Sequence, residues 1–162
     1  MKTNQLLFTV LLLVTATVFQ LLAQQNEADR KVLAEIRAGA DKGDAEAWYE
    51  LGRAFFSGAL GVAKDEAEAV KWFRKAAEQN LADAQYILGV CYDSGEGVAK
   101  DEVEAYKWWL LAAGQGNDDA KYNMTIVENK MSREQIAEGQ RLARDFKLRK
   151  VPSEGSDARL PP

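Results

Sequence analysis

The chain contains one segment twice: the six residues Gly-Val-Ala-Lys-Asp-Glu occupy positions 61–66 and recur unchanged at 97–102. The match extends beyond the hexapeptide at an offset of 36 or 37 residues and pairs Leu51-Gly52 with Leu88-Gly89, Trp72 with Trp108, and Ala76-Ala77 with Ala112-Ala113. The offset changes because the turn before the first hexapeptide is one residue longer, which loops tolerate. A period of this length predicts two stacked copies of the same unit.

Apolar spacing predicts that each copy is a pair of helices. In the first copy, apolar residues follow the three- and four-residue spacing of one helical face in a helix A (Ala47, Trp48, Leu51, Ala54 and Phe55) and then in a helix B (Ala69, Trp72, Phe73, Ala76 and Ala77). The glycine-rich residues 57–61 separate the two helices. Gly52 and Gly89 lie inside helices A, where glycine is unfavourable, so they indicate that another helix approaches closely.

Short polar residues mark the expected helix starts. Asp65 is expected to cap helix B, with Glu68 bonding back to the helix start in a capping box, and Asp101 and Glu104 repeat this pair in the second copy. Another capping box, Ser132 with Gln135, opens a final helix.

Helical spacing continues on both sides of the repeats. Val32, Leu33, Ile36 and Ala40 predict a leading helix over residues 29–42. A third helix A follows the second copy, because Ala120, Tyr122 and Met124 match Ala84, Tyr86 and Leu88, although its glycine turn is missing. The last helix has a heavily charged outer face, which suits the end of a stack that no further unit covers.

These patterns predict an all-α protein, a right-handed α-α superhelix (solenoid) of antiparallel helix pairs with N- and C-terminal capping helices. By residue number we expect a signal peptide (1–23), a linker and leading helix (24–44), two repeats (45–80 and 81–116), a partial repeat with a capping helix (117–150) and a disordered tail (151–162).

The two ends differ from the rest of the chain. Lys2 precedes an apolar run that turns polar at Gln24, which predicts a secretory signal cleaved near Ala23 and hence a periplasmic or secreted protein. The alternative is an uncleaved membrane anchor formed by residues 6–22. At the other end, residues 151–162 hold all three prolines and little apolar content, which is typical of a disordered tail.

Charge and residue types exclude several functions. The formal charge of -4 makes nucleic acid a poor partner. The chain has no histidine, so histidine triads and histidine general bases are excluded. Cys91 is the single cysteine and falls on the apolar stripe of helix A, where an inert core thiol is expected. Two acidic pairs, Asp65-Glu66 and Asp118-Asp119, stand at helix starts and are interpreted as capping groups. We therefore expect no cofactor, no metal site and no enzyme.

The combined pattern is distinctive. Ala-x-x-x-Leu-Gly-x-x-(Phe/Tyr)-x-x-Gly, then Gly-Val-x-x-Asp, then Ala-x-x-Trp-x-x-x-Ala-Ala, resembles the Sel1-like repeat, a relative of the tetratricopeptide repeat. Residues 131–137 and 140–143 are similar to the C-terminal cap common in bacterial secreted members. The resemblance covers residues 29–148 and implies an α-solenoid that binds proteins or peptides and scaffolds assemblies. Some members pair cysteines within each repeat and are linked to β-lactam binding or hydrolysis; this chain lacks such pairs.

The expected binding surface lies where the copies differ. By analogy with tetratricopeptide arrays, helices A line the concave face, with these candidate residues: Glu46, Tyr49, Arg53, Phe56, Asp83, Tyr86, Val90, Asp93, Tyr122 and Ile126. The three tyrosines form a ladder that is compatible with either a core or an interface role. We expect a non-catalytic scaffold or adaptor of the cell envelope or secreted space that binds a protein or peptide. The alternative is a cell-wall or β-lactam-directed hydrolase that uses carboxylates or Cys91.

Overall fold

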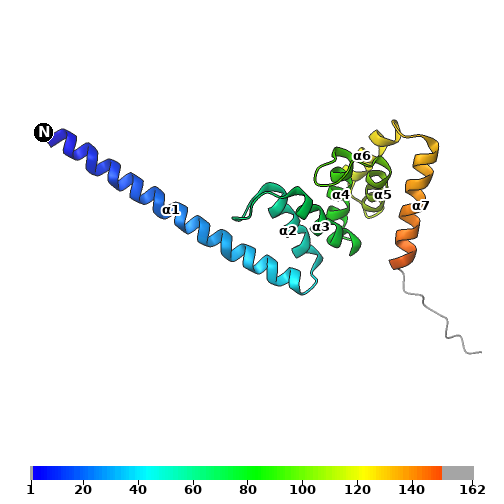
Figure 1. Ribbon diagram of the computed structural model, residues 1–162, viewed down its shortest axis with the longest axis horizontal. Coiled ribbons are helices and arrows are strands. Elements are labelled where there is room, and N and C mark those ends of the chain that lie inside the picture. The colour runs from blue at the N-terminus through cyan, green and yellow to red at the C-terminus, as the bar shows by residue number, and fades with distance from the viewer. Residues whose placement is uncertain (1, 151–162) are drawn as a thin grey trace, which may run out of the picture.

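The helices follow one another along a stacked array (Figure 1). The computed structural model describes residues 2–150, with side chains described from residue 13 to residue 149. This part of the chain contains helices and no strand: α1 (Lys2–Asp41), α2 (Ala45–Ser57), α3 (Glu66–Glu78), α4 (Ala82–Ser94), α5 (Glu102–Ala113), α6 (Asp118–Glu128) and α7 (Arg133–Lys150). The predicted all-α solenoid is confirmed. The predicted tail, residues 151–162, lies outside the described residues.

The two copies of the repeated sequence fold alike. Helix α2 packs on α3 as α4 packs on α5, and α3 and α4 join the pairs into one array. Both helices A have 13 residues and end at a glycine in the left-handed conformation, Gly58 with φ 71° and Gly95 with φ 80°. The Ser-Gly sequence that both copies share therefore ends both helices in the same way, as the period predicts.

Small residues let the paired helices approach closely. A β carbon added at Gly52 would lie 2.5 Å from the Phe73 ring, and one added at Gly89 would lie 2.5 Å from Trp109 Nε1. The aromatic ring of each helix B thus rests directly on the backbone of its own helix A. This contact explains the mid-helix glycines and confirms the expected close approach.

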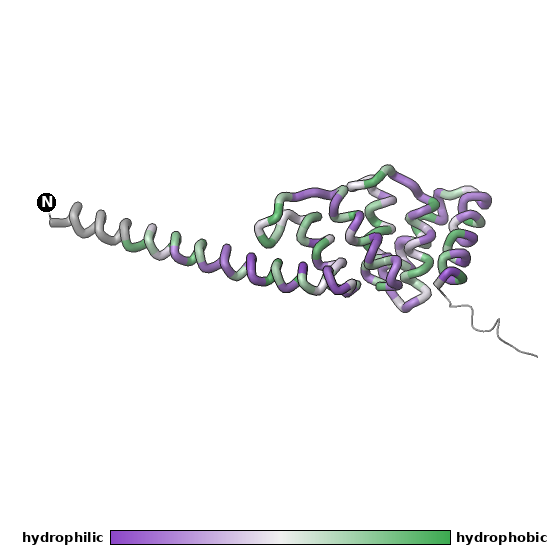
Figure 2. The backbone as a smooth tube through the Cα atoms, turned by 60° about the horizontal axis from the view of Figure 1, so that its bottom comes forward, coloured by the Kyte–Doolittle hydropathy of each residue, from purple (hydrophilic) through white to green (hydrophobic). Residues whose placement is uncertain are grey.

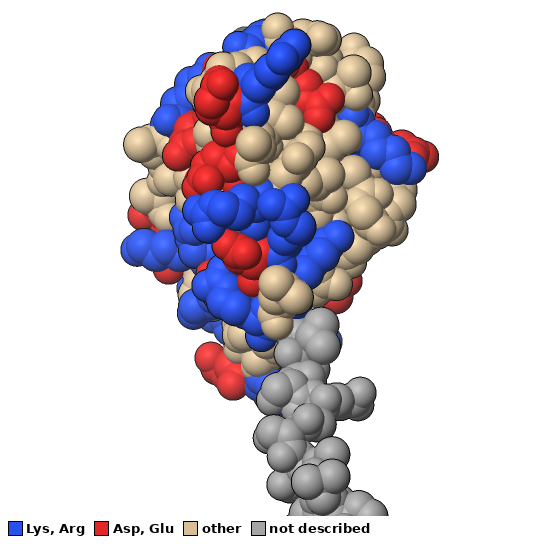
Figure 3. Space-filling model, turned by 90° about the vertical axis from the view of Figure 1, so that its right-hand side faces the viewer, with Lys and Arg blue, Asp and Glu red and all other residues tan. Residues whose placement is uncertain are grey.

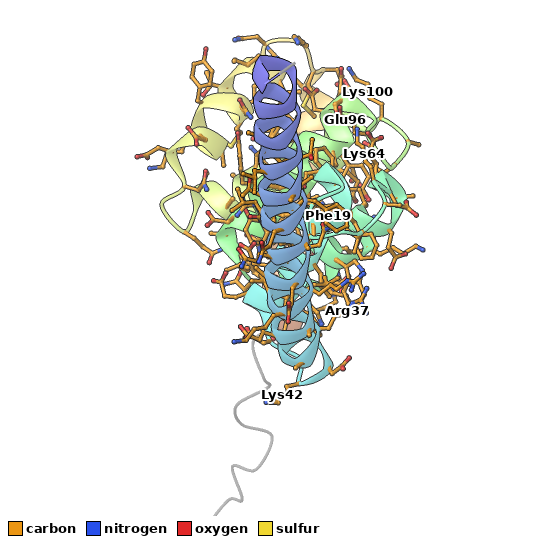
Figure 4. The ribbon with its side chains drawn as sticks, turned by 90° about the vertical axis from the view of Figure 1, so that its left-hand side faces the viewer. Phe19, Arg37, Lys42, Lys64, Glu96 and Lys100 are labelled. Atoms are coloured by element: carbon orange, nitrogen blue, oxygen red, sulfur yellow. The ribbon has the colours of Figure 1, made fainter. Side chains whose placement is uncertain are left out.

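The two hexapeptide loops stack on each other. Gly97 has φ +71°, and its α carbon lies against the backbone carbonyl of Glu66 at the start of α3. Lys64, Glu96 and Lys100 lie together over these loops (Figure 4). The pKa of Lys64 is raised, first by its hydrogen bond and ion pair with Glu66 and in smaller part by the Glu96 carboxylate of the neighbouring loop.

The helix caps differ in part from the sequence prediction. The carboxylate of Asp65 accepts a bond from the Glu68 backbone N–H at 2.9 Å, as expected. The Glu68 carboxylate does not accept the return bond from the Asp65 N–H, because that N–H donates to the Phe55 carbonyl at 2.8 Å. Glu68 pairs with Lys71 instead. The capping box between Ser132 and Gln135 is complete, with bonds of 2.8 and 3.2 Å.

The second copy repeats this outcome. Asp101 caps α5, while its own N–H donates to the Tyr92 carbonyl at 2.9 Å. The Glu104 carboxylate therefore turns away from the helix start and accepts bonds from Lys107 and from Trp108 Nε1, each at 3.0 Å.

Helix α1 begins much earlier than the leading helix predicted at residue 29. It runs without a break through residues 24–28, because this polar stretch contains neither glycine nor proline. Leu33 and Ala40 are its buried residues, and the side chains of residues 13–28 are exposed, so its first half projects away from the array (Figure 1). Among the described residues, no helix has the length and apolar character that crossing a membrane requires.

Helix α7 closes the other end of the array. It packs on α5, where the Phe146 ring meets the Trp108 ring edge-on at 5.4 Å between centroids. Hydrophilic residues predominate along it (Figure 2), and the exposed Arg141 bonds to Glu138 at 2.6 Å and to Asp145 at 2.8 Å. Charged side chains thus cover the C-terminal end of the array, as a capping helix requires.

Candidate binding surface

The predicted site residues lie on one side of the three helices A, α2, α4 and α6, which we call the helix-A face. None of them is fully buried. Exposed residues are Glu46, Arg53, Asp83, Tyr122 and Ile126, and half-buried ones are Tyr49, Phe56, Tyr86, Val90 and Asp93. Stacking of equivalent helices therefore leaves every one of these positions at the surface.

The first-repeat part of the helix-A face is an aromatic platform. The rings of Tyr49 and Phe56 pack on the buried ring of Phe73, with centroids 5.9 and 6.2 Å apart. The Arg53 guanidinium lies 5.9 Å from the Tyr49 ring and bonds to Glu50 at 3.2 Å. Burial raises the pKa of the Tyr49 hydroxyl, Arg53 lowers it, and the carboxylate of Asp83 raises it from the neighbouring repeat. Tyr49 and Phe56 thus pack on the buried Phe73 ring and are also partly exposed on the helix-A face.

The second and third repeats enclose a hollow of about 230 Å³ on the helix-A face. Three predicted residues line it together: Val90 and Asp93 from α4, and Ile126 from α6. The buried Trp109 of α5 also lines the hollow and donates from Nε1 to the Tyr86 carbonyl at 3.2 Å. Lys130, in the short connection that replaces the glycine turn after α6, also lines the hollow.

Other predicted residues lie outside this hollow. Tyr122 is 69% exposed. Asp83 accepts a bond from Asn117 Nδ2 at 3.3 Å, which joins α4 to the start of α6. Arg53 also lines a separate hollow of about 340 Å³ between α1 and α2.

Sequence reasoning missed the other residues that line the helix-A hollow: Ser94, Trp109, Asn123, Val127 and Lys130. Trp109 belongs to the apolar stripe of helix B, which gives no sign that its edge reaches the opposite surface. Lys130 offered a signal, because it stands in the short connection that replaces the glycine turn.

The groups considered for catalysis have structural roles. Cys91 is fully buried, and burial raises the pKa of its thiol to about 11. Asp65 caps α3, whereas α6 is capped by Asn117, with Asp118 and Asp119 in its first turn. A hydrogen bond from Lys121 lowers the pKa of Asp118. Among the described residues no three acidic or thiol side chains converge as metal ligands would.

Two helix pairs of the same kind, stacked with their first helices on one face, define an α-solenoid, a class of repeat proteins that present an extended surface. The Sel1 repeat family matches residues 45–81 and 82–117. The chain is a Sel1-like repeat protein, and such proteins typically mediate contacts between proteins.

Known structures share this architecture. A protective antigen of uropathogenic Escherichia coli with an SLR fold superposes with a TM-score of 0.69 at 30% identity, over 82% of this chain and 31% of the antigen. A Sel1 repeat protein from Oxalobacter formigenes gives a TM-score of 0.59 at 31% identity, over 74% of this chain and 52% of that protein.

A shorter match links the chain to a plant protein. The ERAD-associated E3 ubiquitin-protein ligase component HRD3A of Arabidopsis thaliana is 35% identical over 56 residues, which is 35% of this chain and 8% of HRD3A. The chain thus spans 8% of HRD3A and 31% and 52% of the two proteins of known structure, so their activities do not transfer to it directly.

Proposed function

We propose that the chain is a non-catalytic scaffold or adaptor that holds a segment of a partner protein on its helix-A face. One observation carries this proposal. Outside α1, the large apolar side chains that the described residues expose are Tyr122, Ile126 and Leu148, and the first two lie on the helix-A face. Exposed aromatic and aliphatic groups beside a hollow are the features of a protein interface.

The hollow indicates what the partner presents. Its walls, Val90, Ile126 and Trp109, suit one apolar side chain, and such an anchor in a pocket supplies much of an interface's binding free energy. Asp93 and Lys130 also line the hollow and form no ion pair with each other in the described part of the chain. Each can therefore pair with a charge on the partner, which would fix the direction of the bound segment.

Site-specific photo-crosslinking tests the proposal. A photoreactive phenylalanine analogue replaces Tyr122 or Ile126, and in a matched control it replaces Lys71, which is exposed on α3. We expect discrete cross-linked products from envelope extract at the first two positions and none at the control. The double variant Arg53→Glu, Tyr86→Ala should lose the proteins that the wild type retains. Identical partner lists for the double variant and the wild type would remove the helix-A face from consideration.

No observation favours the alternative, a cell-wall or β-lactam-directed hydrolase. The Cys91 side chain has no exposed surface, and a thiol whose pKa is about 11 is protonated at neutral pH. Hydrolysis of such substrates by the purified protein, lost in Cys91→Ser, would reverse this conclusion.

We further propose that the chain acts in the cell envelope or outside the cell after cleavage near Ala23. The support is the apolar run that follows Lys2 and ends at polar Gln24. The N-terminal residue of the protein purified from cells tests this directly. A chain that still begins at Met1 and fractionates with membranes would support the anchor formed by residues 6–22.

A further inference from the structure

A second groove lies on the side of the array formed by the helices B, between α3 and α7 with α5 as its floor; we call it the B-face groove. Two hollows, of about 650 and 410 Å³, share Glu78 of α3 and Phe146 of α7 and therefore adjoin. Leu111 and Trp108 of α5 lie beneath them. The groove exists because α7 packs on α5 and leaves the flank of α3 uncovered.

The charges along the B-face groove have one dominant sign. Four cationic residues line it, Arg74, Lys107, Lys147 and Arg149, against a single acid, Glu78. Lys107 is neutralised by Glu104 at 3.0 Å, whereas Arg74, Lys147 and Arg149 form no ion pair in the described part of the chain. Figure 3 shows Lys and Arg side chains gathered toward the C-terminal end of α7. A basic groove in a chain of net charge -4 is a local separation of charge.

Hydrogen bonds within the protein fix the positions of several polar side chains in the B-face groove. The Arg74 guanidinium donates to the Tyr92 hydroxyl at 2.6 Å and lies 5.6 Å from the centre of that ring, which fixes its position. At the other end of the groove, Asn80 Nδ2 donates to Gln115 Oε1 at 3.2 Å, and Gln115 Nε2 donates to buried Gln85 at 2.8 Å. Fixed amides and a fixed guanidinium bind with a smaller entropic penalty than mobile ones.

The B-face groove is separate from the helix-A face. Neighbouring tryptophans of α5 divide the two surfaces: Trp109 lines the hollow on the helix-A face, and Trp108 lines the B-face groove. The inference therefore does not rest on the function proposed above.

We propose that the B-face groove binds an acidic, extended peptide segment of a partner protein. Carboxylates of the segment pair with Lys147, Arg149 and Arg74. The two guanidinium groups bind carboxylates through two parallel hydrogen bonds. The amides of Asn80 and Gln115 offer further bonds to the peptide backbone. Two hollows with an aromatic floor and a few cations suit a peptide better than a nucleic acid, which needs a long basic surface on a protein that is not acidic overall.

Selection from a library of random 12-residue peptides tests this proposal. Peptides are first selected for binding to the wild-type chain. Those that also bind the variant Lys147→Gln, Arg149→Gln are then discarded, because they bind outside the groove. We expect the surviving peptides to be enriched in Asp and Glu. A labelled peptide of the resulting consensus should bind the wild type at least tenfold more tightly than the variant, and its affinity should fall as salt rises. Survivors without acidic enrichment would overturn the proposal.

A matched control separates the groove from general charge. The variant Arg30→Gln, Arg133→Gln removes two exposed positive charges that lie outside the groove. It should bind the consensus peptide within about twofold of the wild type, because screened surface charges at a distance contribute little. An equal loss in both variants would overturn the proposal. So would a single-stranded oligonucleotide that binds more tightly than the peptide and is lost in the groove variant.

Discussion

At the scale of single residues, Gly61 and Gly97 provide a matched pair. Both are in the left-handed conformation, with φ +76° and +71°. A β carbon at Gly61 meets nothing within 4 Å, whereas one at Gly97 would collide with the backbone of Glu66 and Ala67. Only the second repeat has a preceding loop to stack on. Close packing therefore requires a glycine at position 97 but not at position 61.

We therefore predict unequal costs for the two alanine substitutions. Gly61→Ala should lower the free energy of unfolding by about 1–2 kcal/mol, the cost of the left-handed conformation alone. Gly97→Ala should cost about 3 kcal/mol or more, because the stacked loops must also separate. Urea unfolding of both variants measures the difference. Equal costs would mean that the loops do not support each other.

Cys91 gives a prediction in alkaline solution. Its thiol pKa is raised from 9.0 to about 11 by burial, so the folded state holds its proton where the unfolded state loses it. Stability that is fully present below pH 9 is therefore lost as the pH rises toward 11. Urea unfolding should show a steeper loss of stability over this range for the wild type than for Cys91→Ala. Parallel pH profiles would contradict the raised pKa.

At the scale of helices, sequence periodicity predicted where the elements lie, because spacing alone decides which face is apolar. Details that depend on distant partners were not predictable. The Glu68 side chain does not return to the helix start because Phe55, in the preceding helix, takes the N–H of Asp65. The start of α1 was placed too late, because only its last third contacts the array and shows an apolar stripe.

The candidate site, like the helices, was predictable from the sequence only in part. Val90 and Ile126 occupy equivalent positions 36 residues apart, so their place on one face followed from the repeat itself. The hollow between them was not predictable, because it depends on how Trp109 of α5 packs under Val90 and on the path of the chain at Lys130.

The equivalent acids Glu68 and Glu104 give the prediction at this scale. Glu104 accepts bonds from Trp108 and from Lys107, whose side chain is 11% exposed. Glu104→Ala leaves both donors unpaired and should cost about 2–3 kcal/mol of unfolding free energy. Glu68→Ala removes an exposed pair with Lys71 and should cost about 0.5 kcal/mol. Thermal and urea unfolding measure both.

The comparison of these two variants is internally controlled. Each loses one carboxylate from the first turn of a helix B, so the loss of the favourable helix-dipole interaction is the same. The difference between them therefore isolates the partly buried pair. A Glu68→Ala cost as large as that of Glu104→Ala would show that the first-turn charge, and not the pair, is what stabilises the helix.

At the scale of the whole molecule, the array is closed differently at its two ends. Charged α7 covers the last repeat, whereas the last third of α1 covers the first repeat through Leu33, Ile36 and Ala40. Trp48 Nε1 of α2 also donates to the Ala40 carbonyl at 2.9 Å. The part of α1 that contacts the array is thus its last few turns, whereas the side chains of residues 13–28 are exposed.

Two truncations test this division of α1. A chain that begins at residue 24 should unfold within about 2 °C of the full-length chain, because residues 24–28 expose their side chains and the contacts start at Leu33. A chain that begins at residue 42 uncovers Ala47 and Leu51 and should unfold about 10 °C lower, since losing about 3 kcal/mol shifts the midpoint of a domain of this size by that amount. Calorimetry measures both midpoints. If removal of residues 1–23 alone lowered the midpoint by as much, the apolar N-terminal segment would be part of the folded array, and the inference that it is a removable leader would fail.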